Sequence, residues 1–241
     1  MFENNIKGHI SKQFDMELET VREHLFKMGG LVEKQVQDAL TALIDGNEKL
    51  AKKVIKRDRK VNALEIKIDE LCTQILAQRQ PAASDLRLII TIIKIITDLE
   101  RIGDEAERLA VTAKKVKEKH ISAEREEYQY VSALGELILD MLKKTLDALA
   151  RMDTDDALEI IKQEGSVHEK FDEFLSYLID RMKQKPKTIK SVLSISWSAR
   201  ALERMGDHIQ NINEFIIYQA KGRDVRHLEL DELIETLDED F

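Results

Sequence analysis

Apolar residues recur every three or four positions along most of this chain. One run holds Val54, Val61, Leu64, Ile68 and Leu71, and another holds Leu88, Ile92, Ile95, Leu99, Ile102, Ala106 and Leu109. Because an α-helix has about 3.6 residues per turn, this spacing places the apolar side chains on one face of a helix. The pattern therefore predicts amphipathic helices that each bury one stripe.

Turn-forming residues interrupt this pattern at regularly spaced places. The interruptions are Asp45–Asn47, Gln80-Pro81, His120–Ser122, Asp153–Asp155, Lys185-Pro186 and Lys221-Gly222. They divide the chain into six helical segments of about 30 residues each. Asp85 and Thr188 follow the two prolines, so their side-chain oxygens are expected to cap the third and sixth helices.

The second half of the chain repeats features of the first half. Leu-Glu-Arg-Ile-Gly-Asp at Leu99–Asp104 reappears 103 positions later as Leu-Glu-Arg-Met-Gly-Asp at Leu202–Asp207. A second match, 106 positions apart, sets Asp58, Val61 and Asn62 against Glu164, Val167 and His168. The sequence therefore predicts an all-α fold of two tandem three-helix bundles related by internal duplication.

This duplication predicts four parts of the chain. Residues 1–18 are expected to form a lead-in, 19–119 the first three-helix repeat and 120–222 the second. Residues 223–241 are expected to form an acidic tail that frays, as chain ends commonly do.

The amino-acid composition agrees with long helices and indicates the redox compartment. Charged residues make up 35% of the chain, with only nine Gly and two Pro, a balance that disfavours sandwiches and doubly wound sheets. Cys72, the single cysteine, lies on an apolar stripe, so a core position in a reducing compartment is expected.

Charge and hydropathy indicate a cytoplasmic protein. The start of the chain does not resemble a secretory signal, and Arg87, Lys94 and Asp98 interrupt the longest apolar stretch. The formal net charge of −8 disfavours nonspecific nucleic-acid binding, and membrane association is expected only through partners.

Acidic residues gather beside the apolar stripe in the third helix of each repeat. The first repeat has Glu100, Asp104 and Glu107 there, and the second has Glu203, Asp207, Gln210 and Glu214. The second helices add pairs four positions apart, Asp58 with Asn62 and Glu164 with His168. Two facing helices could direct these side chains at a hard cation. The alternative is a set of hydrated acids neutralised from the flank by Arg101 and Arg204.

Both repeats keep a glycine inside this helix, Gly103 and Gly206. Glycine costs about 1 kcal/mol relative to alanine in a helix interior. Its recurrence indicates either a close ligand or tight helix packing.

Several separated segments of the chain carry a further signal: His9–Leu18, Met28–Glu33, Arg79–Leu88, both Leu-Glu-Arg-x-Gly-Asp runs and Arg226–Leu228. Together these segments resemble the PhoU family of bacterial phosphate-transport accessory proteins. The resemblance implies a negative regulator of the phosphate-starvation response that modulates phosphate uptake. It also implies an adaptor between the sensor histidine kinase PhoR and PstB, the ATPase of the phosphate ABC transporter, and a homodimer.

The family resemblance further implies iron or zinc clusters on paired acidic motifs. The residues that it places there are Asp58, Glu100, Asp104, Glu164, His168, Glu203 and Asp207. Asn62 and His168 depart from the family pattern, which has an acid at both positions. A histidine ring can still bind a metal, whereas an asparagine is the poorer ligand.

The alternative function is a carboxylate-bridged metal-binding protein or metalloenzyme in a helical bundle. Ferritin-like di-iron sites use Glu-x-x-His pairs, and this sequence contains none. It also lacks a glycine-rich phosphate loop. A regulator without catalytic activity is therefore the expected function.

Overall fold

Every regular element in the described part of the chain is a helix. The computed structural model describes residues 12–118, 125–226, 228 and 230–238. Its elements are α2 (Lys12–Ile44), α3 (Glu48–Arg79), α4 (Ala83–Glu118), α5 (Arg125–Arg151), α6 (Thr154–Gln184), the 3-10 turn η1 (Pro186–Thr188), α7 (Ile189–Lys221) and α8 (Leu230–Asp238). The predicted all-α fold with six long helices is confirmed.

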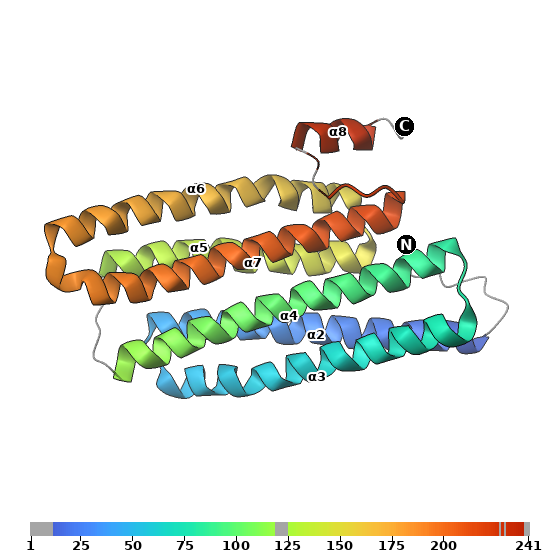
Figure 1. Ribbon diagram of the computed structural model, residues 1–241, viewed down its shortest axis with the longest axis horizontal. Coiled ribbons are helices and arrows are strands. Elements are labelled where there is room, and N and C mark those ends of the chain that lie inside the picture. Colours follow the sequence, from blue (N-terminus) through green and yellow to red (C-terminus); the bar gives the residue numbers. More distant parts are fainter. Residues whose placement is uncertain (1–11, 119–124, 227, 229, 239–241) are drawn as a thin grey trace.

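The long helices form two three-helix bundles that lie side by side. Figure 1 shows α2, α3 and α4 in one bundle, with α5, α6 and α7 packed along it. Helices α4 and α7 are the inner pair and run antiparallel, because Asp98 and Glu105 of α4 meet His208 and Arg204 of α7 in that order. The predicted internal duplication therefore appears as two like bundles that meet along α4 with α7 and also along α2 with α5.

The helix starts differ from the predicted caps. The Asn47 side chain accepts a hydrogen bond from the Leu50 amide at 3.1 Å, and Asp153 accepts one from the Asp156 amide at 3.1 Å. Asp85, by contrast, is the third residue of α4. Thr188 ends η1, and its hydroxyl donates to the Lys185 carbonyl. Asp85 is not the cap of α4, because that helix has already begun at Ala83. Thr188 does occupy the N-cap position of α7, but the predicted side-chain capping bond does not form there.

The two chain ends also differ from expectation. Helix α2 begins at Lys12, inside the predicted lead-in, because Phe14 and Leu18 already belong to the buried stripe. Residues 1–11 lie outside the described part. The acidic tail contains α8, so the expectation that it frays was wrong for Leu230–Asp238. Leu233 of this helix is buried, so an apolar contact packs a segment whose many acidic residues suggested a solvated tail.

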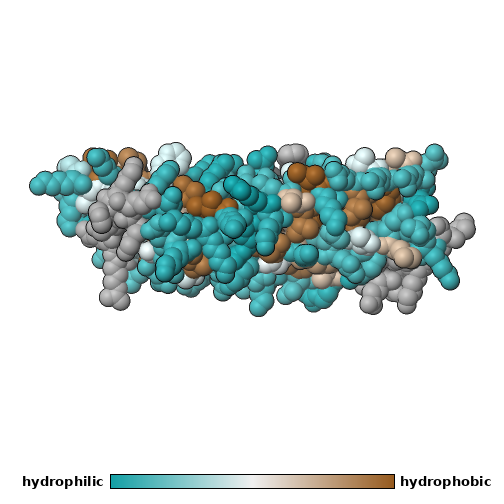
Figure 2. Space-filling model, turned by 90° about the horizontal axis from the view of Figure 1, so that it is seen from below, coloured by the Kyte–Doolittle hydropathy of each residue, from teal (hydrophilic) through white to brown (hydrophobic). Residues whose placement is uncertain are grey.

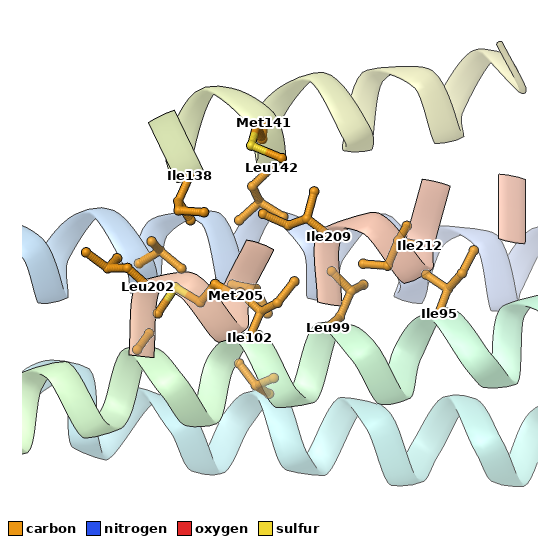
Figure 3. Packing of buried hydrophobic residues seen from close by; sticks show 14 of the residues in the cluster. Ile95, Leu99, Ile102, Ile138, Met141, Leu142, Leu202, Met205, Ile209 and Ile212 are labelled. Carbon is orange, nitrogen blue, oxygen red and sulfur yellow. The ribbon is translucent and has the colours of Figure 1, made fainter. Parts of the chain in front are cut away.

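The core continues from one bundle into the other. Leu99 and Ile102 of α4, Met205 and Ile209 of α7 and Leu142 of α5 are all fully buried. Figure 3 shows these side chains gathered between the α4, α5 and α7 ribbons. Because burying one such side chain contributes about 1.5–3 kcal/mol, this shared layer holds the two repeats together.

Polar side chains cross the same boundary. Asp98 of α4 is buried, and its Oδ1 lies 2.8 Å from His208 Nδ1 and accepts a hydrogen bond from Asn211 at 3.0 Å. Glu105 of α4 is also buried and lies 3.2 Å from Arg204. Buried polar groups must find partners, so these contacts fix the register of α4 against α7.

The surface is largely hydrophilic. Polar residues cover most of the face in Figure 2, and apolar residues reach that surface in separate patches. Within the described residues, none of the helices combines the length and apolarity needed to cross a bilayer.

Candidate metal centre

The first repeat brings three carboxylates together between α3 and α4. One oxygen each from Asp58, Asp104 and Glu107 lies within 4.8 Å of the others. Asp58 comes from the N-terminal half of α3, and the other two come from adjacent turns of α4. Such a set of oxygens suits a hard cation.

Gln35 of α2 supports this group from inside the bundle. Its amide donates to Asp58 Oδ1 at 2.9 Å and to the Gly103 carbonyl at 3.1 Å. Gln35 is fully buried, so these two bonds fix where Asp58 points. One buried amide thereby connects all three helices of the first repeat at the level of the carboxylates.

The second repeat builds its group from α6 and α7. Ligand atoms of Glu164, His168 and Asp207 lie within 4.8 Å of one another. His168 Nε2 is 2.6 Å from Glu164 Oε1, and His168 Nδ1 is 3.4 Å from Glu203 Oε1. His168 therefore lies between carboxylates of two helices, Glu164 of α6 and Glu203 of α7.

Arginines border the two groups unequally. Arg101 lies 3.6 Å from Glu100 and 3.9 Å from Asp104, as expected for a flanking cation. Arg204 instead reaches across to Glu105 of α4, and Arg200 takes its place beside Glu203 at 2.8 Å. Arg204 thus makes its closest ion pair with the neighbouring repeat, while its charge still opposes the rise in the pKa of Glu203.

Burial and mutual repulsion raise the pKa values of three carboxylates in and beside the first group. Burial raises the pKa of Asp58, and the nearby Asp104 raises it further. The pKa of Glu107 is raised by burial and then by Asp58 and Asp104. Burial and the Asp104 charge likewise raise the pKa of Glu100. A bound cation would favour the ionised forms of all three groups.

The second repeat shows the same electrostatic pattern. Burial raises the pKa of Glu164 despite the opposing effect of His168, and Asp207 and Glu203 add to the rise. For Glu203, burial comes first and the Asp207 charge second. Acidic groups that contain carboxylates with raised pKa values thus occur at equivalent positions along the two bundles.

The residues present fit a metal ion. In the described part of the chain, Asn62 Oδ1 and Glu203 Oε2 are buried without a hydrogen-bond partner. An unpaired buried oxygen is costly, and each lies beside a carboxylate group. The first group is all oxygen and suits a hard ion, whereas a histidine nitrogen in the second also suits iron or zinc.

The structure brings most of the predicted ligands together in two groups and leaves two of them at the borders of these groups. Asp58 and Asp104 meet in the first group, and Glu164, His168 and Asp207 meet in the second. Glu100 and Glu203 border these groups, so they stay predicted ligands. Glu107 joins the first group although the predicted ligand set omitted it. Its position one turn after Asp104 on the acidic stripe was the available signal.

The two recurring glycines differ in how closely they are packed. A Cβ at Gly206 would lie 3.2 Å from Val167 Cγ1, which is tight, whereas one at Gly103 would meet its nearest neighbour, Val61 Cγ1, at 3.4 Å. Asp58 Oδ1 would lie only 3.6 Å from that Cβ at Gly103. Helix packing therefore accounts for Gly206, and Gly103 adjoins both a packed valine and a candidate ligand.

Comparison with known proteins decides the family. The family model described as the PhoU domain matches this chain twice, over residues 25–113 and 131–216. The chain belongs to the PhoU family. The two matched stretches fall one in each three-helix bundle, so each PhoU domain supplies one of the two acidic groups.

Relatives in the PhoU family match nearly the whole chain. A phosphate-specific transport system accessory protein PhoU homolog of Pseudomonas aeruginosa is 46% identical, covering 98% of this chain and 96% of its own. The accessory protein PhoU of Escherichia coli strain K12 is 44% identical, covering 98% of each.

Solved PhoU structures share the architecture. The crystal structure of PhoU from Pseudomonas aeruginosa has a TM-score of 0.84 at 47% identity, covering 87% of this chain and all of that one. The regulatory protein PhoU of the phosphate transport system from Streptococcus pneumoniae has a TM-score of 0.80 at 28% identity, covering 88% and 99%.

Proposed function

We propose that this protein restrains the phosphate-starvation response when phosphate is plentiful and modulates phosphate uptake. The observation that carries the proposal is the match over 98% of the chain to proteins named as accessory proteins of the phosphate-specific transport system. A structural relative named as a regulatory protein of the same transport system supports it.

In this proposal the protein is an adaptor rather than an enzyme. It binds the transporter ATPase PstB and the sensor histidine kinase PhoR, and it passes the state of one to the other. It acts in the cytoplasm, where an importer's ATPase and a sensor's kinase domain work, and it forms a homodimer. The long helical faces of the two bundles support such contacts, since helices are common docking elements.

The test is a gene deletion followed by complementation. We expect deletion cells to express a phosphate-regulated reporter even in abundant phosphate, and a plasmid copy to restore repression. Purified PstB and the cytoplasmic part of PhoR should each bind the protein in separate titrations. Unchanged reporter expression would refute the regulatory role, whereas normal repression by a protein that binds neither partner would refute the adaptor mechanism alone.

A second candidate, a metal-dependent enzyme, is favoured by the two acidic groups between facing helices. It predicts that protein loaded with Fe²⁺ consumes oxygen with turnover. We expect metal to bind without turnover, because these groups serve structure or sensing in our proposal. Multiple turnovers that disappear in Asp207→Asn would favour the enzyme instead.

A further inference from the structure

A groove with a basic lining runs between the C-terminal half of α4 and the N-terminal half of α7. Its volume is about 410 Å³, and its wall includes Arg108 and Lys115 of α4 with Arg200 and Arg204 of α7. Figure 1 shows that these halves of α4 and α7 lie together at one end of the molecule. The groove is a local exception in a chain whose formal net charge is −8.

Glu105 holds the floor of this groove in place. It is buried, and its Oε1 lies 2.6 Å from Arg108 and 3.2 Å from Arg204. One carboxylate therefore orients two guanidinium groups. Glu107 also lines the groove and Glu203 pairs with Arg200 at 2.8 Å, so four basic groups face three carboxylates and one positive charge is in excess. Each of these arginine side chains is still about half exposed, so both can bind a further carboxylate.

An apolar row continues from the groove along α7. Trp197 lines the groove and is 70% exposed, and Leu193 and Ile189 precede it at steps of four residues. Side chains four apart lie on one side of a helix. Among the described helices, no other two exposed large apolar residues are three or four positions apart, so this row is distinctive.

We propose that the groove and this row bind an acidic amphipathic helix of a partner protein. From Ile189 to Arg204 the surface spans about 22 Å, the length of a helix of roughly four turns. Carboxylates on one side of that helix meet the basic groove, and its apolar side covers the row. A small anion would fill the groove but would leave Leu193 and Ile189 uncovered.

Tryptophan and arginine are the residues that most often dominate binding energy at interfaces. Here Trp197 stands beside Arg200 and Arg204 in one groove. The inference does not depend on the proposed phosphate regulation, because the surface chemistry is the same whatever signal the partner carries.

The first experiment places a photo-cross-linking amino acid, p-benzoylphenylalanine, at position 197 of the full-length protein in its own cells. Position 66 is the matched control, because Ile66 is an exposed apolar residue on α3. We expect an adduct at position 197 alone. Mass spectrometry should locate it in an acidic segment of another protein whose apolar residues recur every three or four positions.

The second experiment titrates the captured segment, as a synthetic peptide, into the unmodified protein. Trp197 is the only tryptophan, so its fluorescence reports the groove directly. We expect Lys115→Glu and Leu193→Ser each to weaken binding about tenfold. Both residues are exposed, so both variants should fold. Lys60→Glu, which changes an exposed lysine on α3, should leave binding unchanged.

Four outcomes would overturn the proposal. They are the absence of any adduct at position 197, an adduct only with a second copy of this chain, a captured segment that is not acidic and amphipathic, and inorganic phosphate alone displacing the peptide. The second of these would make the groove a self-association surface, and the fourth would make it a small-anion site.

Discussion

Gly135 of α5 lies against Leu40 of α2, so closely that a Cβ at Gly135 would come within 2.5 Å of Leu40 Cδ2. The contact recurs in reverse, because a Cβ at Gly29 of α2 would come within 2.7 Å of Leu146 of α5. Gly135 and Leu146 each stand 106 positions after their counterparts. The two repeats thus exchange equivalent contacts, as the halves of a two-fold symmetric dimer do.

This contact predicts that Gly135→Ala destabilises the protein by about 1–3 kcal/mol, because the added methyl overpacks the boundary. The loss should appear in urea unfolding although alanine favours helix by about 1 kcal/mol. Gly30→Ala is the control, since no atom lies within 4 Å of a Cβ there, and it should stabilise. Equal stability of the two variants would show that Leu40 moves aside freely.

The acidic groups predict a loss of bound metal when their charge is removed. Glu203→Gln with Asp207→Asn keeps the shape of the second group but weakens its hold on a cation, and Glu100→Gln with Asp104→Asn does the same in the first. Metal per chain, measured by mass spectrometry on protein purified without an affinity tag, should fall in each variant. Should both variants retain the wild-type content, the ligand assignment would be wrong.

Folding is predicted to survive removal of metal. Each bundle buries its own apolar stripe, exemplified by Val61 and Leu99 in the first and by Val167 and Leu202 in the second. Circular dichroism at 222 nm should therefore keep most of its amplitude after treatment with a chelator. A collapse of the helical signal would make the metal a requirement for folding.

Cys72 is predicted to be unreactive in the folded protein. It is fully buried in α3, and burial raises the pKa of its thiol to about 12, with a smaller contribution from Asp69. The thiolate is the reactive form, so a thiol reagent at pH 8 should modify Cys72 only after unfolding. Rapid labelling without denaturant would mean that the first bundle opens locally.

The ion pairs of Asp38 predict a loss of folding stability in acid. Burial alone would raise its pKa, but hydrogen bonds from Arg57 and Lys34 outweigh burial and lower the pKa below the ordinary 3.8. A lowered pKa stabilises the fold above the ordinary value, and this stabilisation is lost as pH falls through the folded value. Asp38→Asn should cost about 1–3 kcal/mol at pH 7, and the cost should shrink as the pH falls further below 3.8. A cost that stays constant with pH would exclude a role for this ion pair.

The helices were predictable because apolar periodicity is a property of neighbouring residues. The duplication was predictable because its motifs can be recognised in the sequence itself. Asp58 and Asp104 were predicted as ligands from their spacing and family resemblance. Gln35 was not predicted, since a single polar residue within an apolar stripe does not reveal which helix it faces. The contact between Asp98 and His208 joins residues 110 positions apart, and only the packing of two helices determines it.

The antiparallel contact of α4 with α7 joins the two helices that carry the acidic groups. Each of these helices carries candidate ligands of its own group and also contacts the other repeat. An ion that shifts α4 must therefore work against α7, through the Asp98 and Glu105 contacts. Such coupling is reciprocal: the factor by which an ion at one site changes the affinity of the other site also applies in the opposite direction.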